Sequence, residues 1–195
     1  MILPIVAYGN PVLRQVAQDI TSEYPALDKL IEDMWETMYS SSGVGLAAPQ
    51  INKSIRLFVM DSAQIFNNME DDERKESTYP DAPGIKQIFI NPYIVEAGGN
   101  DWAYNEGCLS IPKIREDVNR PEQVTLKYQD RDFTEHTATF RGITARVIFH
   151  EYDHLEGKLF IDKLSLLKRK LLKRRLDDIT KGNVSVDYKM SFNKR

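Results

Sequence analysis

The segment HEYDH at residues 150–154 constrains the fold of this chain more than any other part of its sequence. In an α-helix, residues four apart share a face and lie about 6 Å apart along the axis, so His150 and His154 could grip one metal ion. Glu151 would lie beside that ion, where it could take a proton from a water molecule.

The residues before this segment support a helix. Ile143, Val147 and His150 are spaced by four and then three, so they form one stripe that is first apolar and then ligating. We therefore expect a helix over residues 142–157 with this stripe buried. The alternative is a chance match on an amphipathic helix with two core histidines. The chain has 3 histidines and two of them occupy this pattern, which favours the metal site.

A catalytic ion of this kind usually has three protein ligands and one position open to water. Cys108, the only cysteine, lies in a turn-like segment and would bind as a thiolate. Alone it would be interpreted as a small buried hydrophobe, but beside a two-histidine site it is the favoured third ligand. His136 is expected on the surface of a hairpin strand. Downstream carboxylates stay open as oxygen ligands: Asp162, Asp177, Asp178 and Asp187.

The remaining elements predict an α+β fold in a single domain over residues 1–195. We expect antiparallel or mixed β-sheets packed around the central helix that carries the histidines. Pro11 after Asn10 predicts a short helix over residues 11–17, and residues 87–95 and 123–129 have the pattern of strands. Residues 43–50 suit neither a helix nor a strand. Residues 61–86, acidic and then rich in proline, are predicted as an insertion loop. Residues 165–195 are predicted to form a C-terminal helix capped by Ser165, and then a terminal strand from the alternation of residues 184–190.

Charge, cysteine count and hydropathy exclude several classes of protein. Lys and Arg total 26 against 29 Asp and Glu, which gives a net charge of -3. This balance argues against a protein whose whole surface binds DNA. A single cysteine excludes an intramolecular disulfide. The first ten residues lack the features of a signal peptide, and no run of about 18 apolar residues occurs. We therefore expect a cytoplasmic protein without a membrane span.

Three segments, in this order, resemble the signature motifs of the peptide deformylase family: GVGLAAPQ at residues 43–50, EGCLS at residues 106–110 and HEYDH at residues 150–154. The resemblance extends from Asn10 to about Leu164. It implies hydrolysis of the N-formyl group from the formyl-methionine of newly made polypeptides, with release of formate.

The resemblance also implies the ligands and the metal. Cys108, His150 and His154 would hold one divalent ion, Fe²⁺ in many members of the family. The same ligands would equally hold Zn²⁺, Ni²⁺ or Co²⁺. Glu151 would take the proton of the attacking water and return it to the leaving nitrogen. The side-chain amide of Gln50 and the backbone N–H of Leu109 would bind the developing oxyanion.

A substrate site can be outlined around these residues. The methionine side chain needs an apolar pocket, for which Val147 and Ile143 on the helix are candidates, with Val44 and Ile111 nearby in the motifs. Gly45 would let a peptide backbone come close, as an added strand does. Glu106 is expected to pair with Arg120 and brace the cysteine loop. The remaining members of the predicted peptide-binding set are Gly107 and Arg115.

Other interpretations stay open on the sequence. One is a different HExxH metallohydrolase or peptidase with Asp162 as third ligand. Another is a non-catalytic binding module that has a closed, structural metal site or no metal. The basic residues 168–175 are either a solvated helix face or a surface that docks on ribosomal RNA through phosphate contacts. The strand expected after this helix departs from the family pattern.

Overall fold

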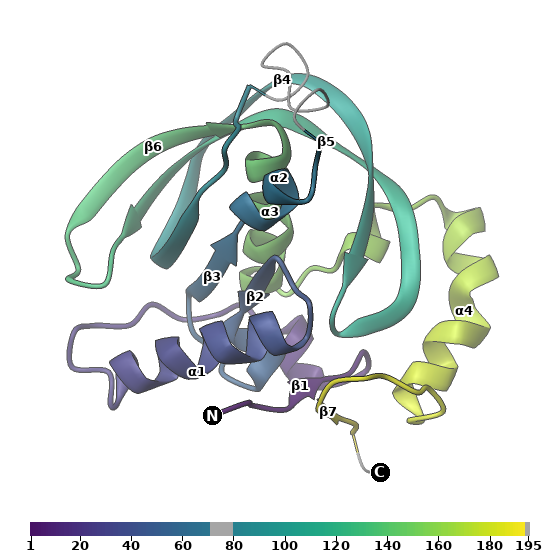
Figure 1. Ribbon diagram of the computed structural model, residues 1–195. Coiled ribbons are helices and arrows are strands. Elements are labelled where there is room, and N and C mark those ends of the chain that lie inside the picture. Colours follow the sequence, from purple (N-terminus) through teal and green to yellow (C-terminus); the bar gives the residue numbers. More distant parts are fainter. Residues whose placement is uncertain (71–79, 194–195) are drawn as a thin grey trace.

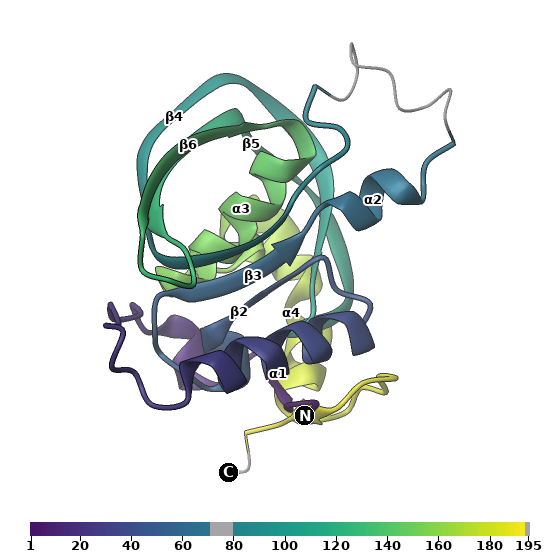
Figure 2. The same cartoon turned by 60° about the vertical axis from the view of Figure 1, so that its left-hand side comes forward.

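A computed structural model describes residues 1–70 and 80–193 of the chain. One sheet dominates it, with five antiparallel strands in the order β2-β3-β4-β5-β6, and it curves around helix α3 (Figures 1 and 2). This arrangement confirms the predicted α+β class. The strands and the helix have these bounds: β2 Gly45–Ala47, β3 Leu57–Asp61, β4 Lys86–Cys108, β5 Ile111–Gln129, β6 Glu135–Arg141 and α3 Gly142–Leu155.

The long β4–β5 hairpin places the cysteine opposite α3. The register of β4 against β5 shifts between Gly98 and Asp101, next to Gly99, whose φ of 80° favours glycine. The hairpin therefore bends and curves around α3 (Figure 1). Its tip is a two-residue turn, Leu109–Ser110, since Cys108 pairs with Ile111. The sequence predicted only separate pieces of these two strands.

Strands of the sheet cover helix α3 on several sides. Its residues Ile148, Phe149 and Leu155 pack in one core cluster with Phe58 and Phe89 of the sheet. The predicted range of 142–157 is confirmed to within two residues at its end. The histidines are thus carried on a rigid, buried element.

The first part of the chain differs from the prediction in two places. The helix expected at residues 11–17 is a single 3₁₀ turn, η1 (Pro11–Arg14), capped by Asn10. It ends early because the N–H of Ala17 donates to the carbonyl of Leu155 at 2.8 Å, which draws the chain out along α3. Residues 43–50, expected to suit neither helix nor strand, contain β2 and a second 3₁₀ turn, η2 (Ala48–Ile51).

Two further helices flank this region. Helix α1 (Leu27–Ser40) buries Ile31, Met34 and Met38 in the core cluster that also contains Leu46 of β2. Helix α2 (Ala63–Asn67) lies inside the segment 61–86 that was predicted as a loop. It forms there with the ring of Phe66 fully buried. Residues 71–79 of that segment lie outside the described residues.

The C-terminal part begins with a helix and ends beside the N-terminus. A 3₁₀ turn, η3 (Phe160–Lys163), leads to helix α4 (Leu166–Thr180), and Ser165 caps α4 as predicted by accepting from the N–H of Lys168. The terminal strand is shorter than expected: only β7 (Met190–Ser191) pairs, in parallel, with β1 (Ile5–Val6). Among the described residues, no helix has the length and apolarity needed to span a membrane.

Candidate metal centre

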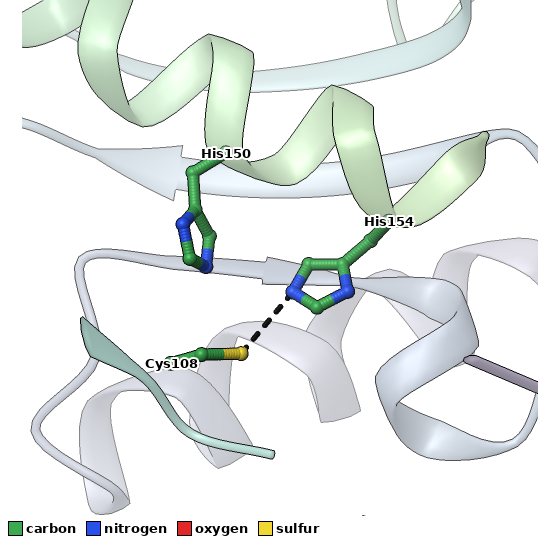
Figure 3. A group of neighbouring side chains, drawn as sticks. All are labelled: Cys108, His150 and His154. Carbon is green, nitrogen blue, oxygen red and sulfur yellow. Dashed lines mark hydrogen bonds between the residues drawn. The ribbon is translucent and has the colours of Figure 1, made fainter. Parts of the chain in front are cut away.

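Three ligand atoms converge between α3 and the tip of the β4–β5 hairpin. His150 and His154 extend from α3 toward Cys108 (Figure 3). Each of the three residues offers a nitrogen or sulfur atom, and these atoms lie within 4.8 Å of one another. The sulfur of Cys108 is 3.3 Å from Nε2 of His154. Separations of this size suit ligands around a single ion.

A buried carboxylate orients one of the imidazoles. Nδ1 of His150 lies 3.0 Å from Oε2 of Glu106, which leaves Nε2 of His150 to face the centre. Arg120 forms two hydrogen bonds with Glu106, at 2.6 and 2.9 Å, and a third with Asp153 at 2.7 Å. Nη1 of Arg146 also donates to Oε1 of Glu106, at 3.1 Å. The predicted pair of Glu106 and Arg120 is thus part of a larger buried network.

This network determines the charge of Glu106. Burial alone would raise the pKa of Glu106, but the hydrogen bonds from Arg120 and His150 outweigh it and hold the pKa well below the ordinary value. The carboxylate therefore stays ionised. Burial also disfavours a charge on His150 and by itself would lower the pKa of His150. The hydrogen bonds of the ring with Cys108 and Glu106 outweigh burial and raise that pKa overall.

Glu151 lies on the same helix, next to His150. Its side chain is buried, and burial raises the pKa of Glu151 to about 7, with a smaller contribution from the charge of Glu106. The backbone of Gly45 packs against it: a Cβ added at Gly45 would lie 2.7 Å from Cδ and 2.8 Å from Cγ of Glu151. Glycine is therefore required here to make room for the carboxylate.

The donor set fits a divalent cation. Within the described part of the chain, two buried polar atoms of this centre, Oε2 of Glu151 and Nδ1 of His154, have no hydrogen-bond partner. Burial is the main reason that the pKa of His154 lies well below its ordinary value, which favours the neutral imidazole that binds a metal ion. One thiol and two imidazoles are a ligand set for iron, zinc, nickel or cobalt, and they leave coordination positions open.

The side chain of Gln50 also faces this centre. Its Oε1 accepts from the N–H of Ala47 at 2.9 Å, and this bond orients the amide. Its Nε2 lies 3.6 Å from the sulfur of Cys108 and 3.4 Å from Oγ of Ser110. Leu109 follows the cysteine in the turn. Gln50 thus brings an amide N–H group beside the cysteine, and Leu109 lines the same cavity.

A cavity of about 630 Å³ opens beside these residues. Most of the predicted peptide-binding set lines it: Val44, Gly45, Glu106, Gly107, Ile111, Arg115 and Val147. Arg115 is held there by two bonds to Asn105.

Ile143 does not line the cavity. It is almost fully buried, two helical turns before His150, whereas the cavity reaches only one turn along α3 to Val147. Its predicted place in the methionine pocket therefore stays a prediction, and in this structure its side chain is buried.

The alternative ligand Asp162 is engaged elsewhere. Both of its oxygens accept from Arg14, at 2.5 and 3.1 Å, and one also accepts from the N–H of Leu159 at 2.8 Å. The ligand cluster does not include it. His136 lies near the surface and bonds to Asp130 at 2.6 Å, as expected of a hairpin residue.

The sequence assigned no role to several residues that lie at this centre. Arg146 and Asp153 lie on α3, but nothing in their spacing indicates that they brace Glu106 and Arg120. Arg146 is among the most buried side chains, although its helical position invites an apolar residue. Ser110 follows the recognised motif cysteine by two. Ser185–Tyr188 also line the cavity, from a segment with no chemical motif.

Comparison with known proteins gives a consistent result. Residues 2–170 match the family model described as polypeptide deformylase. The chain is 51% identical over 192 residues to a peptide deformylase of Christiangramia forsetii, with 98% of this chain and 96% of that one covered. A relative of the same name from Flavobacterium johnsoniae is 51% identical over 195 residues, covering 98% of this chain and 96% of the relative.

Solved structures agree with the sequence relatives. A peptide deformylase from Legionella pneumophila superimposes with a TM-score of 0.75 at 36% identity, covering 94% of this chain and 98% of that chain. A Plasmodium falciparum peptide deformylase, in complex with an inhibitor, gives a TM-score of 0.74 at 34% identity, covering 91% and 99%.

Proposed function

Because the chain belongs to the polypeptide deformylase family, we propose that Cys108, His150 and His154 hold the metal ion on which its hydrolysis of N-formyl groups depends. The enzyme removes the formyl group from the N-terminal formyl-methionine of newly made polypeptides and releases formate. The observation that carries the ligand assignment is the convergence of three ligand atoms within 4.8 Å.

The chain's own residues supply the proton transfers. A bound divalent ion would polarise the formyl carbonyl and lower the pKa of a water molecule beside it. Glu151 is buried next to His150, and its pKa of about 7 suits a group that takes a proton and gives it back near neutral pH. We assign it the proton of the attacking water and its return to the leaving nitrogen.

Two donors are assigned to the developing oxyanion. Nε2 of Gln50 points toward the sulfur of Cys108, and its orientation is set by the bond from Ala47 to the other end of the amide. The backbone N–H of Leu109 is the second donor. Losing one such donor typically raises the barrier by about 2.7–4 kcal/mol.

The peptide is assigned to the cavity beside β2. This strand is the edge of the five-stranded sheet, so the substrate backbone can pair with it as an added strand. Val44, Ile111 and Val147 supply apolar surface for the methionine side chain, and Arg115 lies at the rim.

We assign Fe²⁺ as the physiological ion and the cytoplasm, where polypeptides are made, as the location. The test of the function is anaerobic purification, elemental analysis and an assay for formate release from a formyl-Met peptide. Glu151→Gln should keep the metal and lose most of the activity. Full activity in that variant would refute the assigned base, and a parent enzyme that releases no formate would refute the function. Zinc, nickel or cobalt in place of iron would overturn only the metal assignment.

Helix α4 is proposed as a contact to ribosomal RNA. Leu166, Leu167 and Leu171 are exposed on it, beside the basic residues 168–175. Part of that charge is neutralised within the protein, since Lys168 pairs with Glu116 and Lys173 with Asp177.

The test of this contact uses basic residues of α4 other than Lys168 and Lys173, which form the two ion pairs. Arg169, Lys170 and Arg174 are all exposed. Reversing these three charges should abolish salt-sensitive co-sedimentation with ribosomes. Unchanged co-sedimentation, or none by the parent, would contradict this contact.

A further inference from the structure

The end of the described chain returns to the cavity that holds the proposed catalytic groups. Residues Ser185–Tyr188 line the same cavity as Cys108, Gln50 and Glu151. This segment passes beneath the tip of the β4–β5 hairpin (Figure 1). It bends at Asp187 and Tyr188 and pairs with no strand of the described residues, so its position must be set by contacts on either side of it.

Those contacts hold the segment firmly. After it, the carbonyls of Lys189 and Ser191 accept from the N–H groups of Ile5 and Ala7, each at 2.9 Å. Before and after it, apolar side chains pack on the core cluster that includes residues of η3 and α4: Val184, Met190 and Phe192. These contacts fix the backbone on both sides of Tyr188 and therefore fix where its side chain lies.

Tyr188 contacts the turn that follows the cysteine. Its hydroxyl donates to the carbonyl of Leu109 at 2.6 Å. The neighbouring carbonyl, that of Ser110, accepts from the N–H of Tyr8 at 2.8 Å. Both carbonyls of the two-residue turn are therefore held from outside the hairpin. Burial, together with the charge of Cys108, raises the pKa of Tyr188, so the phenol keeps the proton that it donates.

We propose that Tyr188 is a positioning residue, which fixes the Leu109 turn so that the N–H of Leu109 keeps its direction toward the developing oxyanion. A bond to the carbonyl of Leu109 restricts rotation about its Cα–C bond, and the pairing of Cys108 with Ile111 restricts the other side of the turn. An N–H group that is already held in position does not have to reorient when negative charge develops on the oxygen. This inference rests on the proposed function and assigns a task to a segment outside the three sequence motifs.

The test compares Tyr188→Phe with Tyr93→Phe in the metal-loaded enzyme. Each change removes one hydroxyl that donates a single hydrogen bond; that of Tyr93 goes to Asp19 at 2.8 Å, and Tyr93 does not line the cavity. We expect Tyr188→Phe to lower kcat about tenfold, the scale of one hydrogen bond, with KM within about twofold of the parent. Amide hydrogen exchange of residues 104–112 should become faster in that variant alone.

Each result decides the inference. Equal kcat for Tyr188→Phe and the parent would overturn it, as would a loss of kcat that Tyr93→Phe reproduces. A rise in KM alone would show that Tyr188 contacts substrate and does not act through Leu109. Unchanged exchange at residues 104–112 would also overturn it. Since the parent enzyme is assayed alongside, failure of the proposed function would appear separately, as a parent without formate release.

Discussion

Replacing Gly45 by alanine should disable the proposed base while leaving the ligands in place. The added Cβ would lie 2.7 Å from Cδ of Glu151 and nearer still to Oε1, and ordinary contact begins near 3.4 Å, so the carboxylate would have to retreat by at least about 0.7 Å. The retreat is not a free rotation, because Cγ is also only 2.8 Å away and Glu151 is 4% exposed.

The size of the effect follows from these distances. A catalytic group displaced by about 1 Å can lose about 10²-fold in rate, so we expect a loss of 30- to 100-fold, roughly, in kcat for formate release. Overpacking should also lower the free energy of unfolding by about 1–3 kcal/mol. Metal content should not change, since the new methyl group contacts Glu151 and not the ligands.

Gly98→Ala is the matched control, because a Cβ at Gly98 would meet nothing within 4 Å. It should have the parent's kcat. The assay is steady-state formate release, with elemental analysis and thermal unfolding of both variants. A Gly45→Ala enzyme with kcat within about threefold of the parent would refute the reasoning, because Glu151 would then tolerate displacement. A variant that had lost its metal would also refute it.

Three further outcomes are expected. Glu106→Gln should lower the free energy of unfolding in urea by about 3 kcal/mol, because Arg120 and Arg146 lose a buried counter-charge; a change of less than about 1 kcal/mol would contradict this. Leu172→Ala should destabilise the protein by about 2–5 kcal/mol in thermal unfolding, whereas exposed Leu171→Ala should change stability by about 0.5 kcal/mol or less; equal effects would show that α4 is packed differently. Asp162→Asn should keep a full complement of metal by elemental analysis, and a loss would return Asp162 to the ligands.

The sequence predicted the parts of this site that have a local signature. The spacing of His150 and His154 predicted a helix that presents both imidazoles on one face, and the structure has that helix. Ser165 was correctly predicted as a helix cap from residue type and spacing. These features depend on residues within a few positions of one another, where helical geometry alone relates sequence to space.

Features that depend on tertiary contacts were missed. The bend at Gly98–Gly99 that lets one hairpin enclose α3 has no signal that separates it from an ordinary turn. Arg146 and Asp153 contact Glu106 and Arg120 across the fold, and no spacing along the chain relates these four residues. The alternation of residues 184–190 suggested a strand, but a strand also needs a partner, and the described part of the chain provides one only at Met190–Ser191.

The most direct test of the metal centre is anomalous diffraction from crystals of anaerobically purified enzyme, recorded on both sides of the absorption edge of the metal found by elemental analysis. We predict one anomalous peak, within about 2.0–2.4 Å of the sulfur of Cys108 and of Nε2 of both His150 and His154. A peak bound by other residues, or a fully active enzyme with no peak between these three side chains, would contradict the assignment.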